Sequence, residues 1–330
     1  MSQMTKAIVL HATGGVDQFR HEEVSVPDPG PGQVLLRQTA IGVNYIDVYH
    51  RSGLYPLPAM PAIIGMEGAG VIEAVGDGVT DLTLGDRVAY ACGPVGAYAA
   101  LRVAPAAQMV RIPSGISDEI AASIMLKGMT AQYLLHDTAP VRAGDVVLVH
   151  AAAGGVGLLL CQWAKYLGCT VIGTVSTEAK AELAAANGCD HTIITRSGDF
   201  AAQVKEITAS KGCRVIYDGV GRDSFAGSME ALALCGRLVS YGQASGPIEP
   251  ISPPMLSAKS ATISRPVLFH YTAQRPDLLR IANALFDVIG SGAVKVGTPA
   301  RYSLVDAAKA HSDLEGRRTT GQLVLMPSQG

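Results

Sequence analysis

Short apolar runs alternate four times with helix-like segments between residues 145 and 241, and this alternation most constrains the fold. The first run, DVVLVH at 145–150, precedes apolar residues that recur at helical spacing up to Leu167. Strands that are apolar throughout are buried on both faces, as in a parallel sheet covered by helices. Because parallel crossovers are right-handed, the sequence predicts a doubly wound α/β sheet here.

The expected elements of this region follow one another with short connections. Strands are expected at 145–150, 170–175, 191–195, 214–217 and 237–241. Helices are expected at 156–167, from the end of the second strand to about 187, at 199–209 and at 222–234, with a later one at 277–289. Gly168 is placed to end the first helix.

The glycine-rich turn HAAAGGVG at 150–157 lies between a buried strand and an amphipathic helix. Gly154 and Gly155 allow backbone amides to approach a pyrophosphate, and Gly157 allows the helix to pack closely on the sheet. The N-terminus of the helix adds partial positive charge. The sequence therefore predicts a dinucleotide site, with a glycine turn that serves packing alone as the alternative.

The end of the second strand bears on the choice of cofactor. NAD-specific sites place an acidic residue there for the ribose 2′-hydroxyl. Here the chain reads GTVSTEAK at 173–180, with uncharged residues at the end of the strand and Glu178 slightly later. Lys180 and Arg196 are within reach of a 2′-phosphate, which favours NADPH. The alternative is that both cations are ordinary solvated surface charges.

Length and composition indicate two domains in a globular protein. The chain has 330 residues, of which 48% are hydrophobic and 16% charged. Residues 1–125 are rich in Gly, Pro and Val and have short alternating stretches, which predicts a β-rich domain. We expect residues 266–330 to complete that domain and residues 126–265 to form the dinucleotide domain.

Charge and cysteine usage exclude several classes of protein. A formal net charge of −2 without a local basic run argues against nucleic acid as a partner. The N-terminus resembles neither a signal peptide nor a membrane span. None of the six cysteines forms a C-x-x-C pair, so we expect free thiols and a cytoplasmic protein.

Several motifs together resemble the medium-chain dehydrogenases/reductases, specifically their zinc-independent quinone oxidoreductase branch. The carriers are GVNYIDVY at 42–49, RSGLYP at 51–56, GDRV at 85–88, LKG at 126–128, HAAAGGVG at 150–157, YDGVG at 217–221 and SRP at 264–266. The resemblance spans essentially the whole chain. It implies a GroES-like β-barrel catalytic domain, a Rossmann NADPH-binding domain and an active site in the cleft between them.

The resemblance also implies a set of cofactor contacts and a homodimer. The implied contacts are Asn44, Lys127, Gly154, Gly155, Val156, Gly173, Ser176, Lys180, Tyr241, Gly242 and Arg265. The chain departs from the pattern of the bacterial quinone reductases that it resembles at Thr195, where they usually carry a tyrosine before the arginine at 196, so weaker binding of the 2′-phosphate is expected. The expected dimer contact uses edge strands near residues 237–270.

The positions of the metal ligands in zinc-dependent members of this superfamily are altered. The cysteine position reads Asn44 and the histidine position reads Met66, and neither is a good ligand for zinc. We therefore expect no metal. Asn44, Asp47 and Tyr55 are the candidate catalytic residues, expected as polar groups at the substrate pocket. For Asp47, a buried carboxylate tied to backbone amides is an equal alternative to a catalytic role.

The function implied is zinc-independent, NADPH-dependent reduction of quinones by hydride transfer. A quinone needs no metal, because its reduction creates an aromatic ring, so positioning against the nicotinamide suffices. One alternative is reduction of activated double bonds in 2-alkenals, enones or enoyl thioesters. An alternative of another class is an NADPH-sensing or RNA-binding protein. The sequence leaves open the preferred acceptor and whether electrons transfer singly or as hydride.

Overall fold

The computed structural model describes residues 3–195 and 199–327 and divides the chain into two compact units. Unit 1 contains residues 1–127, 272–286 and 297–330, and unit 2 contains residues 128–271 and 287–296. Two of the four divisions, at 127/128 and 286/287, fall inside helix α2 (Asp118–Tyr133) and helix α8 (Arg275–Gly290). Residues 266–271 and 287–296 group with unit 2, and the domain boundaries expected at 125/126 and 265/266 stay predictions.

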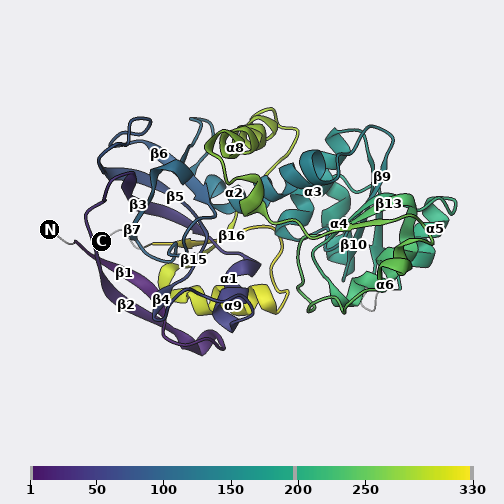
Figure 1. Cartoon of the computed structure of the whole chain (residues 1–330), viewed down its shortest axis with the longest axis horizontal. Coiled ribbons are helices and arrows are strands. Elements are labelled where there is room, and N and C mark those ends of the chain that lie inside the picture. Colours follow the sequence, from purple (N-terminus) through teal and green to yellow (C-terminus); the bar gives the residue numbers. More distant parts are fainter. Residues whose placement is uncertain (1–2, 196–198, 328–330) are drawn as a thin grey trace. The chain divides into compact units, whose positions relative to one another are not determined.

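Unit 2 is built on a six-stranded parallel sheet with the strand order β11-β10-β9-β12-β13-β14 (Figure 1). Its strands are β9 (Val146–Val149), β10 (Thr170–Val175), β11 (His191–Ile194), β12 (Cys213–Asp218), β13 (Leu232–Ser240) and β14 (Thr262–Ser264). The chain runs outward from β9 to β11 and then returns across the sheet to β12. This reversal is the doubly wound topology, which confirms the fold class expected from the alternation.

The helices of unit 2 follow the strands in the predicted order. They are α3 (Gly155–Tyr166), α4 (Glu178–Ala186), α5 (Ala201–Ile207), α6 (Arg222–Ala231) and α7 (Leu268–Tyr271), with a π-helical turn at Leu134–Thr138. Gly168 has a φ of +84°, the left-handed conformation that ends α3 as expected. The core between sheet and helices includes Leu148, Ile172 and Ile216, each fully buried.

One expected boundary in unit 2 is wrong. The helix predicted for residues 222–234 ends at Ala231, and the next strand begins at Leu232 instead of Arg237. Leu232 pairs with Cys213 across β12 and β13, and the pairing is irregular between Cys213 and Val215. Backbone pairing with the neighbouring strand therefore overrides the helical propensity of the ALAL segment.

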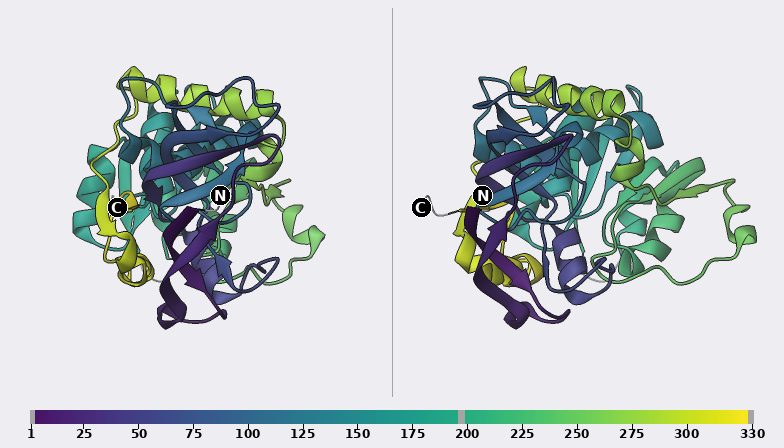
Figure 2. Two further views of the ribbon diagram at one scale, coloured as in Figure 1. Left: turned by 90° about the vertical axis from the view of Figure 1, so that its left-hand side faces the viewer. Right: turned by 60° about the vertical axis from the view of Figure 1, so that its left-hand side comes forward.

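Unit 1 contains two β-sheets. The larger one has the order β15-β16-β3-β5-β6-β8 with β7 paired to β3, and the smaller one has the order β2-β1-β4. The strands are β1 (Gln3–Leu10), β2 (Phe19–Val26), β3 (Gln33–Gly42), β4 (Ala62–Ile63), β5 (Glu67–Val75), β6 (Arg87–Ala91), β7 (Leu101–Pro105), β8 (Val110–Arg111), β15 (Ala300–Ser303) and β16 (Leu323–Met326). Figure 2 shows the long β1–β2 ribbon beside the larger sheet.

Two short helices complete unit 1 next to these sheets. Helix α1 (Tyr45–Ser52) follows β3 directly, and α9 (Ala307–Glu315) contacts β15 and β16. The remaining short helical turns of the unit are η1 (Val16–Gln18), η2 (Ala106–Gln108) and η5 (Leu304–Asp306), and unit 2 contains η4 (Pro253–Leu256). The C-terminal strand β16 pairs with β3, so residues far apart in sequence share one sheet.

All six cysteines are free thiols, which confirms the expectation from their spacing, and only Cys235 is exposed. No helix within residues 3–195 and 199–327 combines the length and the apolarity needed to cross a bilayer.

Gly157 lies in the first turn of α3, where the helix meets the preceding turn. A Cβ on Gly157 would lie 2.3 Å from the carbonyl oxygen of Ala151 and 2.9 Å from the Cα of Ala152. Both neighbours are backbone atoms, which do not move aside cheaply. The predicted role of Gly157 in close packing is confirmed.

We expect Gly157→Ala to lower the free energy of unfolding by about 1–3 kcal/mol, because overpacking outweighs alanine's better helix propensity. Gly290→Ala in α8 is the matched control, since a Cβ there meets no atom within 4 Å. Denaturant unfolding of both variants measures the difference. Equal stability of the two variants would contradict the close contact.

Candidate active site

The residues expected to bind the cofactor in unit 2 gather at the carboxyl ends of its parallel strands. Strand pairing places Gly173, Val149 and Tyr217 side by side, and continues through Val239 to Ser264. The loops that leave this row carry the glycine turn, Ser176, the Tyr241–Gly242 pair and Arg265. In doubly wound sheets, ligands bind at this edge, where the strand order reverses.

The glycine turn connects β9 to α3 and is shaped by backbone contacts. Ala151 has a φ of +51°, and the Gly154 N–H donates to the Ala151 carbonyl at 2.8 Å. Gly154 is the N-cap of α3 and makes no side-chain capping hydrogen bond. Gly154, Gly155 and Val156 are half-buried. A helix N-terminus that directly follows a glycine turn is the arrangement that receives a pyrophosphate.

Gly173 in β10 is required by packing as well as by its place in the sheet. A Cβ on Gly173 would lie 2.6 Å from the Cys189 Sγ and 2.7 Å from the Ala152 Cβ. This residue therefore holds the glycine turn close to the strand, and a larger side chain would push the turn away.

The end of β10 carries no acidic side chain before α4. Ser176 is half-buried, and the hydroxyl of Thr177 caps α4 by accepting from the Lys180 N–H at 3.4 Å. Lys180 therefore stands in the first turn of α4. Arg196, the second cation expected there, lies outside the described residues.

Arg265 stabilises the loop that follows β13 at this edge of the sheet. Its Nη1 donates to the carbonyl oxygens of Ser240 and Gly242, each at 2.8 Å. The backbone N–H of Tyr241 donates to the Asp218 carbonyl at 2.8 Å. Arg265 thus holds the loop that carries Tyr241 and Gly242, and it lines a shallow pocket of about 400 Å³ together with Ser264, Pro266, Val267, His270 and Tyr271.

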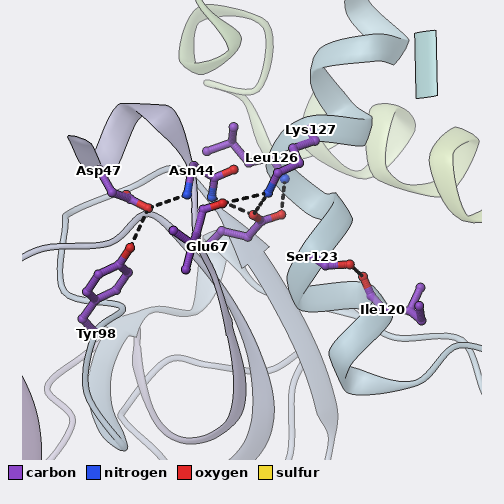
Figure 3. Close-up of polar contacts among 9 residues, drawn as sticks. Asn44, Asp47, Glu67, Tyr98, Ile120, Ser123, Leu126 and Lys127 are labelled. Carbon is purple, nitrogen blue, oxygen red and sulfur yellow. Dashed lines mark hydrogen bonds and ion pairs between the residues drawn. The ribbon is translucent and has the colours of Figure 1, made fainter. Parts of the chain in front are cut away.

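In unit 1, Asn44 and Lys127 meet at a buried carboxylate that belongs to Glu67 (Figure 3). Glu67 Oε2 accepts from the Asn44 Nδ2 at 2.8 Å and from the Lys127 Nζ at 3.4 Å, and Oε1 accepts from the Leu126 N–H at 2.7 Å. The Lys127 ammonium also donates to the Val43 carbonyl at 3.2 Å. Glu67 is fully buried, and Asn44 and Lys127 are 4% and 6% exposed.

Asp47 lies in the first turn of α1, and only one of its two carboxylate oxygens makes hydrogen bonds within the described residues. Its Oδ2 accepts from the Asn44 N–H at 2.9 Å and from the Tyr98 hydroxyl at 3.1 Å. Within the described residues, Asp47 Oδ1 has no hydrogen-bond partner. Burial raises the pKa of Asp47 to about 7, although hydrogen bonds from Asn44 and Tyr98 oppose the shift.

The Tyr98 hydroxyl also meets His311 Nε2, at 2.8 Å. When Tyr98 donates its single proton to Asp47, His311 must donate to the tyrosine oxygen. Burial, with a smaller effect from Arg51, lowers the pKa of His311 to about 3, so its imidazole is neutral. Asp47, Tyr98 and His311 therefore form one buried chain, and sequence reasoning identified only Asp47.

Tyr55 lies beyond the end of α1 in a group of aromatic rings. Its ring centroid is 5.0 Å from that of Tyr49, and Tyr49 in turn is 5.9 Å from Tyr45. These three tyrosines are half-buried. Spaced rings of this kind offer flat apolar surface with polar tips.

The residues at the expected metal position do not form a zinc site. The Asn44 amide nitrogen is engaged with Glu67, and Met66 is buried with a thioether, which suits softer metals. No group of three or more His, Cys, Asp or Glu side chains placed to hold a metal occurs in the part of the chain that the structure describes. The donor set therefore does not fit zinc.

Other residues shape the site without having been predicted. No sequence motif identified the contacts that Glu67, Tyr98 and His311 make here. Asp218 holds the loop after β12, since its Oδ1 accepts from the N–H groups of Val220 and Gly221 at 2.7 and 3.1 Å. The aspartate within YDGVG was the only local signal, because an aspartate before glycines caps tight turns.

Two family models match the chain. The model described as alcohol dehydrogenase GroES-like domain matches residues 30–114, and the one described as zinc-binding dehydrogenase matches residues 155–284. The first match confirms the GroES-like domain expected in unit 1.

Similar proteins cover nearly the whole chain. A 2-haloacrylate reductase from a Burkholderia species is 46% identical over 98% of this chain and 99% of its own length. A quinone oxidoreductase from Pseudomonas aeruginosa is 46% identical over 98% of this chain and its full length.

Among solved structures, Escherichia coli quinone oxidoreductase complexed with NADPH has a TM-score of 0.95 and 41% identity, over 98% of this chain and all of that one. Fold, matched families and relatives agree with the motifs, and the chain belongs to the medium-chain dehydrogenases/reductases, in the branch of the quinone oxidoreductases.

Proposed function

We propose that this protein is an NADPH-dependent reductase of quinones. The observation that carries the proposal is the glycine turn at the start of α3, at the carboxyl edge of the sheet and beside a strand end without an acidic residue. NADPH, when bound, supplies a hydride to an electron-poor acceptor. The relatives named quinone oxidoreductase and the relative complexed with NADPH support this assignment.

The protein's own residues supply binding and orientation. We propose that Gly154, Gly155, Val156, Gly173 and Ser176 hold the pyrophosphate and ribose, and that Lys180 and Arg196 hold the 2′-phosphate. Tyr241, Gly242 and Arg265 are proposed to line the nicotinamide end of the same edge. In unit 1, Asn44 and Lys127 are proposed to contact the cofactor.

For the acceptor, we propose that Tyr55 provides contact through its ring and hydroxyl. A flat quinone suits a group of half-buried tyrosines, because offset stacking between rings is favourable. Reduction of a quinone to a hydroquinone requires one hydride and one proton, and solvent supplies the proton in this proposal.

Reduction of an activated double bond is the second candidate. The similarity to 2-haloacrylate reductase, at 46% identity, favours it. An electron-poor alkene accepts hydride at carbon in the same geometry as a quinone. Both reactions use the same cofactor and differ in the acceptor.

NADPH oxidation by chelator-treated protein tests the proposal, with ortho- and para-quinones, a 2-haloacrylate, a 2-alkenal and an enoyl thioester as acceptors. We expect rapid turnover of quinones that neither chelator nor added zinc changes. Turnover of the alkenes without turnover of quinones would show that the second candidate, reduction of activated double bonds, is the activity. NADPH binding without turnover of any acceptor would instead indicate a cofactor-sensing protein.

A homodimer formed through the edge of the sheet in unit 2 is part of the proposal. β14 is the edge strand, and the segment that precedes it carries exposed apolar side chains at Ile251 and Met255. A pairing of two such edges would cover unpaired backbone groups.

Lys180→Ala tests the choice of cofactor. Loss of a charged hydrogen bond to the 2′-phosphate should weaken NADPH binding about tenfold or more and leave NADH binding unchanged. Lys205→Ala is the matched control, because Lys205 lies on α5 and pairs with Glu230. Steady-state kinetics with both cofactors measures the effect. An equal loss for NADH would contradict the 2′-phosphate contact.

We propose that Asp47 stabilises the start of α1 by accepting the hydrogen bond from the Asn44 N–H. The pH dependence of protein stability tests the raised pKa of its carboxyl group. Because folding raises its pKa from 3.8 to about 7, the folded state binds the extra proton between these values. The stability contribution of Asp47 is therefore fully present below pH 4 and is lost as the pH rises to about 7, by at most about 1.4 kcal/mol per pH unit.

Asp47→Asn should accordingly gain stability relative to the wild type as the pH rises from 4 to 7. His311→Gln should show the opposite trend, since folding lowers the pKa of His311 from 6.5 to about 3 and the stability of neutral His311 is lost as the pH falls. Denaturant unfolding at stepped pH measures both. A constant difference between Asp47→Asn and wild type across this range would contradict the raised pKa.

A further inference from the structure

The side chain of Glu67 fills a buried space beside Gly42, which has no side chain of its own. Glu67 is the first residue of β5, and the pairing of Ile41 with Gly68 brings it opposite Gly42 at the end of β3. A Cβ on Gly42 would lie 2.3 Å from Glu67 Oε2 and 2.3 Å from the Ala122 carbonyl oxygen. Only glycine at position 42 therefore leaves room for this side chain.

Hydrogen-bond donors replace the water that the fully buried Glu67 carboxylate has lost. Three donors reach it, namely the Asn44 amide, the Lys127 ammonium and the Leu126 N–H, at 2.8, 3.4 and 2.7 Å. A buried charge is tolerated when it is paired and hydrogen-bonded in this way. The donors come from the β3–α1 junction and from α2, so one carboxylate joins both segments.

This arrangement fixes the orientation of two polar groups. Because the Asn44 Nδ2 donates to Glu67, the Oδ1 at the other end of the amide points away from the carboxylate (Figure 3). This oxygen faces the Asp47 N–H in the capping box of α1, and its second lone pair can accept a further hydrogen bond. Lys127 directs two of its three protons to Glu67 and to the Val43 carbonyl, which, among the residues that the structure describes, leaves one proton for a ligand.

We propose that Glu67 is a positioning residue, which orients Asn44 and Lys127 toward the cofactor by accepting their hydrogen bonds. This inference rests on the proposed function, in which those two residues contact NADPH. It assigns to the Asn44 Oδ1 the role of acceptor for a cofactor hydroxyl or carboxamide N–H. The carboxylate acts only through its two partners and does not touch the ligand.

Glu67→Gln separates the charge from the shape of the side chain. Glutamine keeps one acceptor but turns an NH2 group toward donors, so the Asn44 amide or the Lys127 ammonium must reorient. It also leaves the ammonium of Lys127 buried without its counter-charge. We expect the Kd for NADPH to rise about tenfold or more, since hydrogen bonds to charged groups are lost.

A mutant cycle on NADPH affinity distinguishes positioning from a general structural effect. The variants are Glu67→Gln, Asn44→Ala and Lys127→Met, the double variant of Asn44 and Lys127, and the triple variant. Isothermal titration calorimetry gives each Kd without any acceptor. In the background that lacks Asn44 and Lys127 side-chain donors, Glu67→Gln should change the Kd by less than about twofold, because the residues through which it acts are gone.

The outcomes are separable. An effect of Glu67→Gln that is equally large in both backgrounds overturns the positioning role alone. Unchanged Kd values for Asn44→Ala and Lys127→Met overturn their placement at the cofactor in the proposed function, and the role of Glu67 falls with it. The acceptor assay is independent of both results.

Melting temperatures of all variants check folding. If Glu67→Gln does not fold, the pair Glu67→Gln/Lys127→Met removes both charges and keeps the buried site neutral. Under the proposal this pair binds NADPH more weakly than Lys127→Met alone, because the Asn44 amide is no longer oriented. Equal affinity of the two would overturn the proposal.

Discussion

The buried carboxylate of Glu67 is the interaction on which the polar site of unit 1 depends. A carboxylate removed from water costs several kcal/mol unless donors replace its hydration. Here the replacement comes from Asn44, Leu126 and Lys127, and Gly42 supplies the space. Removing any one of these groups would leave a charge or a donor unmatched. The site residues are therefore constrained by one another before any ligand is considered.

In unit 2, the candidate site is shaped by glycine residues and backbone groups, whereas in unit 1 it is shaped by polar side chains. The turn after β9 approaches the sheet closely because Gly157 and Gly173 have no Cβ, and Cys189 and Ala152 fill the space beside Gly173. The resulting helix start presents N–H groups, whose positions are fixed by the fold and not by rotamers. Asp218 and Arg265 hold the loops at the same edge through hydrogen bonds to backbone groups.

The sequence predicted features that depend on neighbours along the chain. The parallel sheet, the turn at Gly154 and Gly155, and the end of α3 at Gly168 follow from local periodicity and from glycine geometry. The start of β13 at Leu232 did not, because pairing with the adjacent strand decides it. The partners of Glu67 lie 23, 59 and 60 residues away, and Tyr98 is 213 residues from His311. No local pattern encodes such contacts, so the composition of the buried clusters required the three-dimensional structure.

Under the proposed function, the pairing of the Lys127 ammonium with the Glu67 carboxylate limits the chemistry open to this protein. A catalytic zinc offers an open coordination position that polarises the acceptor oxygen strongly. Lys127 is a compact donor that has two of its protons engaged with Glu67 and Val43, so it can position a ligand but stabilises little developing charge. An unactivated ketone would then be a poor substrate. A quinone and a halogenated acrylate both accept hydride readily by themselves, the first by becoming aromatic and the second through its electron-poor double bond. Under the proposed function, the choice between them is therefore made by the shape of the acceptor site, with the aromatic group around Tyr55 as its candidate wall.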